Sequence, residues 1–208
     1  MQLSCKNGIG FVCIPKCGST TVERFMRPHS DFSLSGNPNL KHIRYHLMES
    51  FIFPLLASSH VKKPFIFAVM REPVSWVESW YRFRGRDELA PPSHPQHHNY
   101  SGHLSFPEYV EAVLQPKPPS YARIHSQFHY IRAHDGSVGV DLIIPLEQVN
   151  SHVPTLLAKY NIRVANPDER KNVSEKREAA ALPAPLKARL QAHLRKDVEL
   201  YNASFETG

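Results

Sequence analysis

FVCIPKCGSTTVERF, residues 11–25, runs from an apolar segment through a short turn into a stretch of good helix formers. The apolar segment, Ile9 to Ile14, is rich in β-branched residues, which predicts a buried strand. Thr20 to Met26 is predicted to be helical, with Ser19 as its N-cap. A turn that joins a strand to a helix N-terminus presents unpaired N–H groups and the positive end of the helix dipole. This stretch is therefore expected to attract an anion.

The side chains of this turn strengthen that expectation. Gly18 lets the backbone approach a ligand closely, Ser19, Thr20 and Thr21 supply hydroxyl donors, and Lys16 supplies a movable positive charge. Together they predict a cradle for phosphate or sulfate. The turn is not a Walker A loop, because that motif places its lysine after the glycines, and here Lys16 precedes Gly18. The alternative is an ordinary tight turn with a solvated lysine.

A second motif follows another apolar segment. PFIFAVM, Pro64 to Met70, predicts a buried strand that ends at Arg71, and Pro73 suits the first turn of the next helix. Ser79 lies eight residues after Arg71, within that helix. An arginine fork with a nearby hydroxyl can bind a second phosphate through charge-assisted hydrogen bonds. The alternative is that Arg71 caps the sheet edge and that Ser79 has no special role.

The remaining patterns complete an α/β fold. Val140 to Glu147 predicts a third strand followed by an amphipathic helix, and one long helix is predicted from Pro185 through Tyr201. Strands that alternate with helices predict three layers, with a central, mainly parallel sheet flanked by helices. Ligands of such sheets bind at the carboxyl ends of the strands, where both motif-bearing turns fall. We expect a single domain over residues 1–208, with a long Pro- and His-rich loop at about 85–107.

Composition limits the classes of function. The chain has 208 residues, 41% of them hydrophobic, and a formal net charge of +6, so it favours an anionic partner. No signal peptide precedes the first apolar segment, and no apolar run in the sequence is long enough to span a bilayer, which predicts a soluble, cytoplasmic protein. No nucleic-acid-binding motif is present. No metal is expected, because the three cysteines form a poor zinc set and the histidines of the long loop lack familiar ligand spacing.

Several segments resemble the sulfotransferases that use 3′-phosphoadenosine-5′-phosphosulfate (PAPS). The sequences of these segments are most similar to the carbohydrate sulfotransferase branch and its bacterial relatives. The chain resembles a compact, soluble, microbial member of that branch. The resemblance implies a P-loop-like fold, and its paired motifs occur in the expected order. The matching segments are IPKCGSTT (14–21, the 5′-phosphosulfate loop), LKHIRYHL (40–47), VMREPVSWVESWY (69–81, the 3′-phosphate segment), EQVNSHVPTLLAKYNI (147–162) and ERKNVSE (169–175).

The resemblance also implies a reaction and a set of site residues. The reaction is in-line transfer of the sulfuryl group from PAPS to an acceptor hydroxyl, with carbohydrate as the acceptor class of that branch. Cys17 departs from the pattern, since threonine is commonest there. The implied donor site comprises Lys16, Cys17, Gly18, Ser19, Thr20 and Thr21 around the 5′-phosphosulfate, Arg71 and Ser79 on the 3′-phosphate, and Arg170 or Lys171 closing over the nucleotide.

An acceptor hydroxyl needs a general base, and histidine suits that task near neutral pH. The resemblance favours His42 as the catalytic base beside Lys16, with His46 and Glu49 as rivals. Two other functions stay open. One is a non-catalytic nucleotide- or glycan-binding module of the same fold, and the other is a P-loop kinase-like phosphotransferase, which the position of Lys16 disfavours.

Overall fold

The computed structural model describes residues 1–164 and 181–206, and the chain divides into two compact units. The first comprises Met1–Arg71, Gln127–Val173 and Glu199–Gly208, and the second comprises Glu72–Ser126 and Ser174–Val198. The single domain expected from the sequence stays a prediction.

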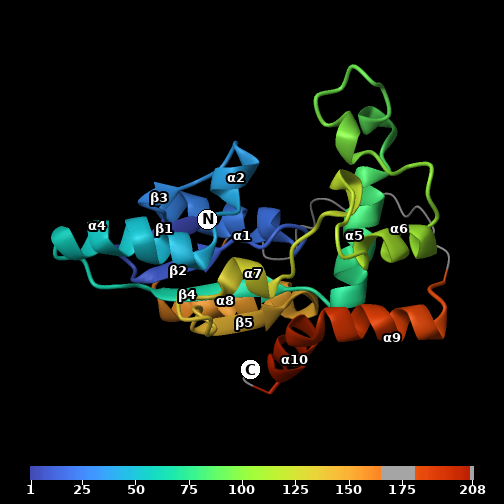
Figure 1. The fold of residues 1–208 in the computed structure, drawn as a ribbon. Helices are drawn as coiled ribbons and strands as arrows, with labels where there is room; N and C mark the ends of the chain where they lie inside the picture. Colours follow the sequence, from blue (N-terminus) through green and yellow to red (C-terminus); the bar gives the residue numbers. More distant parts are fainter. Residues whose placement is uncertain (165–180, 207–208) are drawn as a thin grey trace. The chain divides into compact units, whose positions relative to one another are not determined.

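The first unit is built on a five-stranded mixed sheet with the order β3-β1-β2-β4-β5 (Figure 1). Strands β2, β4 and β5 run parallel to one another, and β1 pairs antiparallel with both β2 and β3. The strands are β1 (Gln2–Ser4), β2 (Ile9–Val12), β3 (Phe32–Ser33), β4 (Phe65–Met70) and β5 (Leu142–Pro145).

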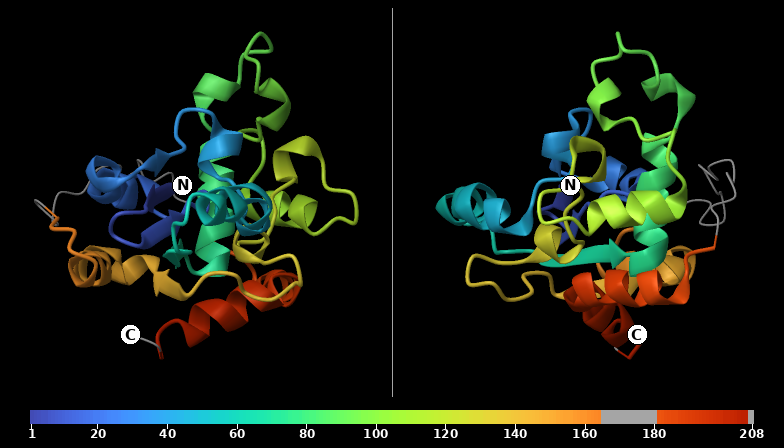
Figure 2. Two further views of the ribbon diagram at one scale, coloured as in Figure 1. Left: turned by 90° about the vertical axis from the view of Figure 1, so that its left-hand side faces the viewer. Right: turned by 45° about the vertical axis from the view of Figure 1, so that its right-hand side comes forward.

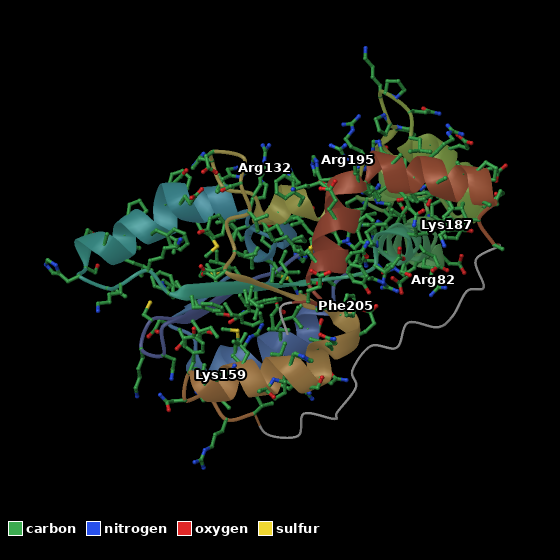
Figure 3. The ribbon with its side chains drawn as sticks, turned by 90° about the horizontal axis from the view of Figure 1, so that it is seen from below. Arg82, Arg132, Lys159, Lys187, Arg195 and Phe205 are labelled. Carbon is green, nitrogen blue, oxygen red and sulfur yellow. The ribbon has the colours of Figure 1, made fainter. Side chains whose placement is uncertain are left out.

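The three parallel strands, β2, β4 and β5, correspond to the three strands predicted from the sequence. Strand β4 is buried along nearly its whole length, as its FIFAVM sequence indicates, because helices cover both faces of the sheet (Figure 3). Val12 pairs with Ala68, and Met70 pairs with Pro145, so β2, β4 and β5 end at the same edge of the sheet. The predicted α/β fold with a central, mainly parallel sheet is confirmed, and both motif-bearing turns leave the sheet at this edge.

Helices cover both faces of this sheet. Figure 3 shows α1 and α8 on one face and α4 and α7 on the other. The helices of this unit are α1 (Ser19–Met26), α2 (Pro38–Lys41), α3 (Tyr45–Leu47), a π-helical turn (Met48–Ile52), α4 (Phe53–Ser58), α7 (Phe128–Ile131) and α8 (Val149–Lys159), with 3₁₀ turns at Arg27–His29 and Leu146–Gln148.

The second unit is helical. Helices α5 (Pro73–Arg84), α6 (Phe106–Val113) and α9 (Ala184–His193) pack against one another (Figure 2). The predicted long loop lies between α5 and α6 and contains only two 3₁₀ turns, Asp87–Leu89 and His97–Asn99; a third, Ser120–Ala122, follows α6.

The prediction of one long C-terminal helix is wrong. Helix α9 ends at His193, and α10 (Arg195–Ala203) is a separate helix. Leu194 between them has φ −98° and ψ 25°, which interrupts the helical path although the apolar spacing continues across it. Within residues 1–164 and 181–206, no helix combines the length and the apolar character that crossing a membrane requires.

Candidate functional site

The turn after β2 has an unusual backbone. Lys16 has a φ of 67° and Gly18 a φ of 65°, and Cys17 between them has no positive φ. A lysine in the left-handed region costs about 1–2 kcal/mol relative to the right-handed one. Such alternation turns successive N–H groups toward one side, which is the geometry of anion-binding backbone concavities. The turn is therefore more than a plain connection between a strand and a helix.

Helix α1 begins differently from the sequence prediction. Gly18, in the left-handed conformation, is the N-cap, and Ser19 is the first helical residue, so the prediction of Ser19 as N-cap is wrong. Among the described residues, no side chain forms a capping hydrogen bond at this helix end. Ser19 is buried, whereas Thr20 is exposed and Thr21 is half-buried. The accessible hydroxyls of the turn are those of Thr20 and Thr21, and the uncapped helix end adds its N–H groups and dipole.

Gly18 is required here for two separable reasons. Its positive φ disfavours any Cβ, and a Cβ built at Gly18 would lie 2.6 Å from Cδ1 of Leu146. Gly8 has a similar φ of 69° with nothing within 4 Å of its own Cβ position. Gly8→Ala should lower the free energy of unfolding by about 1–2 kcal/mol through backbone strain alone. Gly18→Ala should cost about 1 kcal/mol more, because overpacking adds to the strain.

Urea unfolding of both variants checks this prediction. Equal losses in the two variants would mean that Leu146 moves aside without cost, and that only the backbone conformation requires glycine at position 18.

Arg71 follows directly on β4, at the same sheet edge as the Lys16 turn. Its side chain is partly exposed and makes no ion pair or side-chain hydrogen bond with any residue in 1–164 or 181–206. Its backbone is fixed instead: its N–H donates to Oε1 of Gln127 at 2.9 Å, and its carbonyl accepts from Nε2 of Gln127 at 2.8 Å. A guanidinium at the carboxyl end of a central strand, with no acidic partner in the described chain, can accept an anionic ligand.

Cys17 and Lys16 differ in their surroundings. Lys16 is partly exposed, whereas Cys17 is 1% exposed and donates its thiol to Oε1 of Gln127 at 3.0 Å. Gln127 therefore contacts both motif-bearing segments. No local sequence pattern indicated this residue, because its partners lie 110 and 56 positions away along the chain.

His42 lies against the strand that leads into the turn. It follows α2, is half-buried, and its Nδ1 is 2.8 Å from the carbonyl oxygen of Cys13 and 3.2 Å from the Cys13 thiol. A carbonyl oxygen only accepts, so Nδ1 carries the proton and Nε2 is the basic nitrogen. Burial lowers the pKa of His42 below its usual 6.5, with the Cys13 carbonyl opposing and Lys41 adding to the decrease. His42 is therefore neutral at pH 7, as a general base must be.

The surroundings of His42 hold it in place. Lys41 forms an ion pair with Glu23 of α1 at 3.0 Å, which ties the predicted Lys-His segment to the helix of the anion-binding turn. Burial raises the pKa of Cys13 to about 11, so its thiol stays protonated and does not compete as a nucleophile.

The two rival bases have structural partners. Glu49 accepts a hydrogen bond from the backbone N–H of His134 at 2.9 Å. The rings of His46 and His134 pack edge to face, with centroids 5.5 Å apart. Burial and the nearby Arg44 lower the pKa of His46. Both side chains belong to a contact between the α3 region and the segment after α7, and neither contacts Cys13 or the turn in any hydrogen bond of the described residues.

The structure does not place the other predicted site residues relative to this set. Ser79 is half-buried on α5 in the second unit, and Arg170 and Lys171 lie outside the described residues. In the described part of the chain, no three His, Cys, Asp or Glu side chains are arranged to hold a metal ion. In the long loop, the His97 ring stacks on Tyr100, and Tyr100 also packs against His103.

Comparisons with known proteins give little support at the level of sequence. No protein-family model matches this chain, and no curated protein matches it. The chain is similar to a solved structure described as a sulfotransferase from Alicyclobacillus acidocaldarius, with 18% sequence identity, a TM-score of 0.46, and coverage of 94% of each chain. A likeness of that strength carries no argument about activity.

Proposed function

We propose that this chain is a sulfotransferase that moves the sulfuryl group of PAPS to an acceptor hydroxyl, with carbohydrate as the acceptor class. One observation carries the proposal. The Lys16 turn and Arg71 follow neighbouring parallel strands at one sheet edge, and Gln127 hydrogen-bonds to both segments. Two cationic groups joined in this way suit a ligand with two anionic groups, and PAPS carries a 5′-phosphosulfate and a 3′-phosphate.

The turn would hold the 5′ end of the donor. Its backbone concavity, the uncapped start of α1 and the hydroxyls of Thr20 and Thr21 supply donors for phosphosulfate oxygens. As the acceptor oxygen bonds to sulfur, the bond between sulfur and the bridging oxygen breaks, and negative charge develops on the departing 5′-phosphate. Lys16 would stabilise that charge. Ser79, and Arg170 or Lys171, keep the roles that the sequence resemblance implies.

His42 would remove the acceptor proton. The Cys13 carbonyl binds Nδ1–H, so Nε2 is the nitrogen that takes the proton as the acceptor oxygen attacks. The products are a sulfate ester and adenosine 3′,5′-bisphosphate. Positioning and charge stabilisation account for catalysis in such in-line transfers, with little covalent chemistry left to the protein.

The pH dependence of the rate tests the role of His42. The pKa of His42 lies below 6.5, so His42 stays deprotonated as the pH falls from 8 to 6.5. Over that range kcat/KM should stay constant. Only under that value should the rate fall as His42 becomes protonated. His42→Gln should lower kcat about 10²–10⁴-fold and remove this acidic limb.

Initial rates from pH 4.5 to 8 check the prediction, with His29→Gln, a change at an exposed histidine, as the control. An unchanged acidic limb in His42→Gln would assign the base to another group and return His46 and Glu49 to consideration.

Binding calorimetry tests the proposed function itself. The protein should bind adenosine 3′,5′-bisphosphate more tightly than AMP, because AMP lacks the 3′-phosphate. Transfer of labelled sulfate from PAPS to a panel of glycan and phenolic acceptors would then identify the acceptor class. Equal or absent binding of both nucleotides would overturn the assignment of PAPS as donor.

A further inference from the structure

Gln127 is a buried residue of the first unit that hydrogen-bonds to two separate segments. Its side chain is 0% exposed, and every polar atom of its carboxamide is used. Oε1 accepts from the Cys17 thiol at 3.0 Å and from the Arg71 N–H at 2.9 Å, while Nε2 donates to the Arg71 carbonyl at 2.8 Å. One buried amide therefore joins the Lys16 turn to the end of β4.

The carboxamide acts on Arg71 as a neighbouring strand would. The pairing of β4 ends at Ala68 on the β2 side and at Met70 on the β5 side, so Arg71 lies just beyond the regular sheet. Gln127 offers it one acceptor and one donor, the same two groups that a strand residue offers. The ordered backbone of β4 is thereby extended by one residue, up to the residue that carries the guanidinium.

The Cys17 thiol has a related role. It is directed at Gln127 and lies 3.6 Å from the carbonyl of Pro15, so its polar contacts are internal. Cys17 stands between the two residues of positive φ, Lys16 and Gly18. Holding its side chain from within the protein therefore fixes the part of the turn where the backbone reverses its conformation. Its backbone, and not its thiol, is then the part available to a ligand.

We propose that Gln127 is a positioning residue that sets the separation between the two anion-binding segments and thereby the preference for a nucleotide with a 3′-phosphate. This inference rests on the proposed function and adds a specificity determinant to it. Gln127 touches no ligand atom in this scheme. It acts through Arg71 on one side and through Cys17 on the other.

Two variants separate these connections. Gln127→Met keeps the length of the side chain and removes all three hydrogen bonds. Cys17→Ala removes only the thiol contact, while Cys17→Ser keeps a donor at that place. Gln2→Met is the matched control, because Gln2 is also 0% exposed in the same unit and its amide has no hydrogen-bond partner among the described residues.

The measurement is the ratio of the dissociation constants of AMP and adenosine 3′,5′-bisphosphate, by calorimetry, with thermal unfolding of each protein alongside. Gln127→Met should lower this ratio about tenfold, since two hydrogen bonds to Arg71 are lost. Cys17→Ala should lower it about threefold, Cys17→Ser should stay within about twofold of the wild type, and Gln2→Met should leave it unchanged. Cys17→Ala should add nothing in the Gln127→Met background, because the shared contact is already gone.

The outcomes separate this inference from the proposed function. A wild type that prefers the bisphosphate, with the same ratio in Gln127→Met and Cys17→Ala, would overturn the role of Gln127 and leave the donor assignment standing. A fall in melting temperature at constant ratio would have the same meaning, since a merely structural amide affects stability alone. A wild type without any preference would overturn the donor assignment and this inference together. Should Gln127→Met fail to fold, the pair Cys17→Ala and Cys17→Ser decides.

Discussion

Replacing Lys16 with alanine is expected to lower kcat about 10²–10³-fold while adenosine 3′,5′-bisphosphate still binds. The reason lies in where charge develops. The bisphosphate is a product without a sulfuryl group, whereas the bridging oxygen gains charge only as its bond to sulfur breaks. A cation placed for that oxygen stabilises the transition state more than it stabilises the bound nucleotide.

The backbone at Lys16 makes this substitution informative. Lysine and alanine both carry a Cβ, so the strain of a φ of 67° is the same in the two proteins, and the turn keeps its conformation. Lys16→Gln retains most of the length without the charge and should behave like Lys16→Ala. Lys62→Ala, which alters an exposed lysine of the same unit, serves as the control for net charge.

Single-turnover rates and calorimetry on the same samples distinguish an enzyme that uses Lys16 from a non-catalytic binding module. Loss of transfer with retained binding supports an enzyme that uses Lys16 in the transition state. An undiminished kcat in Lys16→Ala would remove Lys16 from the mechanism. Wild-type protein that binds the bisphosphate but transfers sulfate to no acceptor would favour the non-catalytic binding module.

The sequence predicted the three parallel strands better than the two antiparallel ones. Ile9–Val12, Phe65–Met70 and Leu142–Pro145 are dense apolar runs, which are typical of parallel strands between layers of helices. Strands β1 and β3 escaped prediction because they have three and two residues, which is too short for an alternating pattern. They form through pairing with an existing strand rather than through local preference.

The sequence predicted residue types for the candidate site, but it did not predict the hydrogen bonds that join them to the rest of the fold. The turn and Arg71 were expected from local motifs, and His42 was expected from the family resemblance. The left-handed conformation of Lys16 and the capping of α1 by Gly18 depend on how the turn meets the rest of the sheet edge. The contacts of Gln127 and the Cys13 carbonyl join segments distant in the sequence, and a single sequence carries no signal for such pairs.

Replacing Arg71 with alanine should abolish the preference for adenosine 3′,5′-bisphosphate over AMP. A bidentate guanidinium contact of about 3 kcal/mol corresponds to a loss of about 100-fold in bisphosphate affinity. AMP affinity should change less than about threefold, because AMP has no group for Arg71 to bind. The turn after β2 should be undisturbed, since Gln127 contacts only the backbone of Arg71, which alanine retains.

Two further variants determine whether the fork of the guanidinium matters or only its charge. Arg71→Lys keeps the charge without the bidentate geometry, so it should recover part of the preference and not all of it. Arg132→Ala removes an exposed arginine of the same unit, labelled in Figure 3, and should leave both affinities unchanged. Parallel losses of AMP and bisphosphate affinity in Arg71→Ala would instead place its contact on a group that both nucleotides share. In that case the 3′-phosphate would have to be recognised by another residue, and Arg71 would belong to the 5′ end of the site.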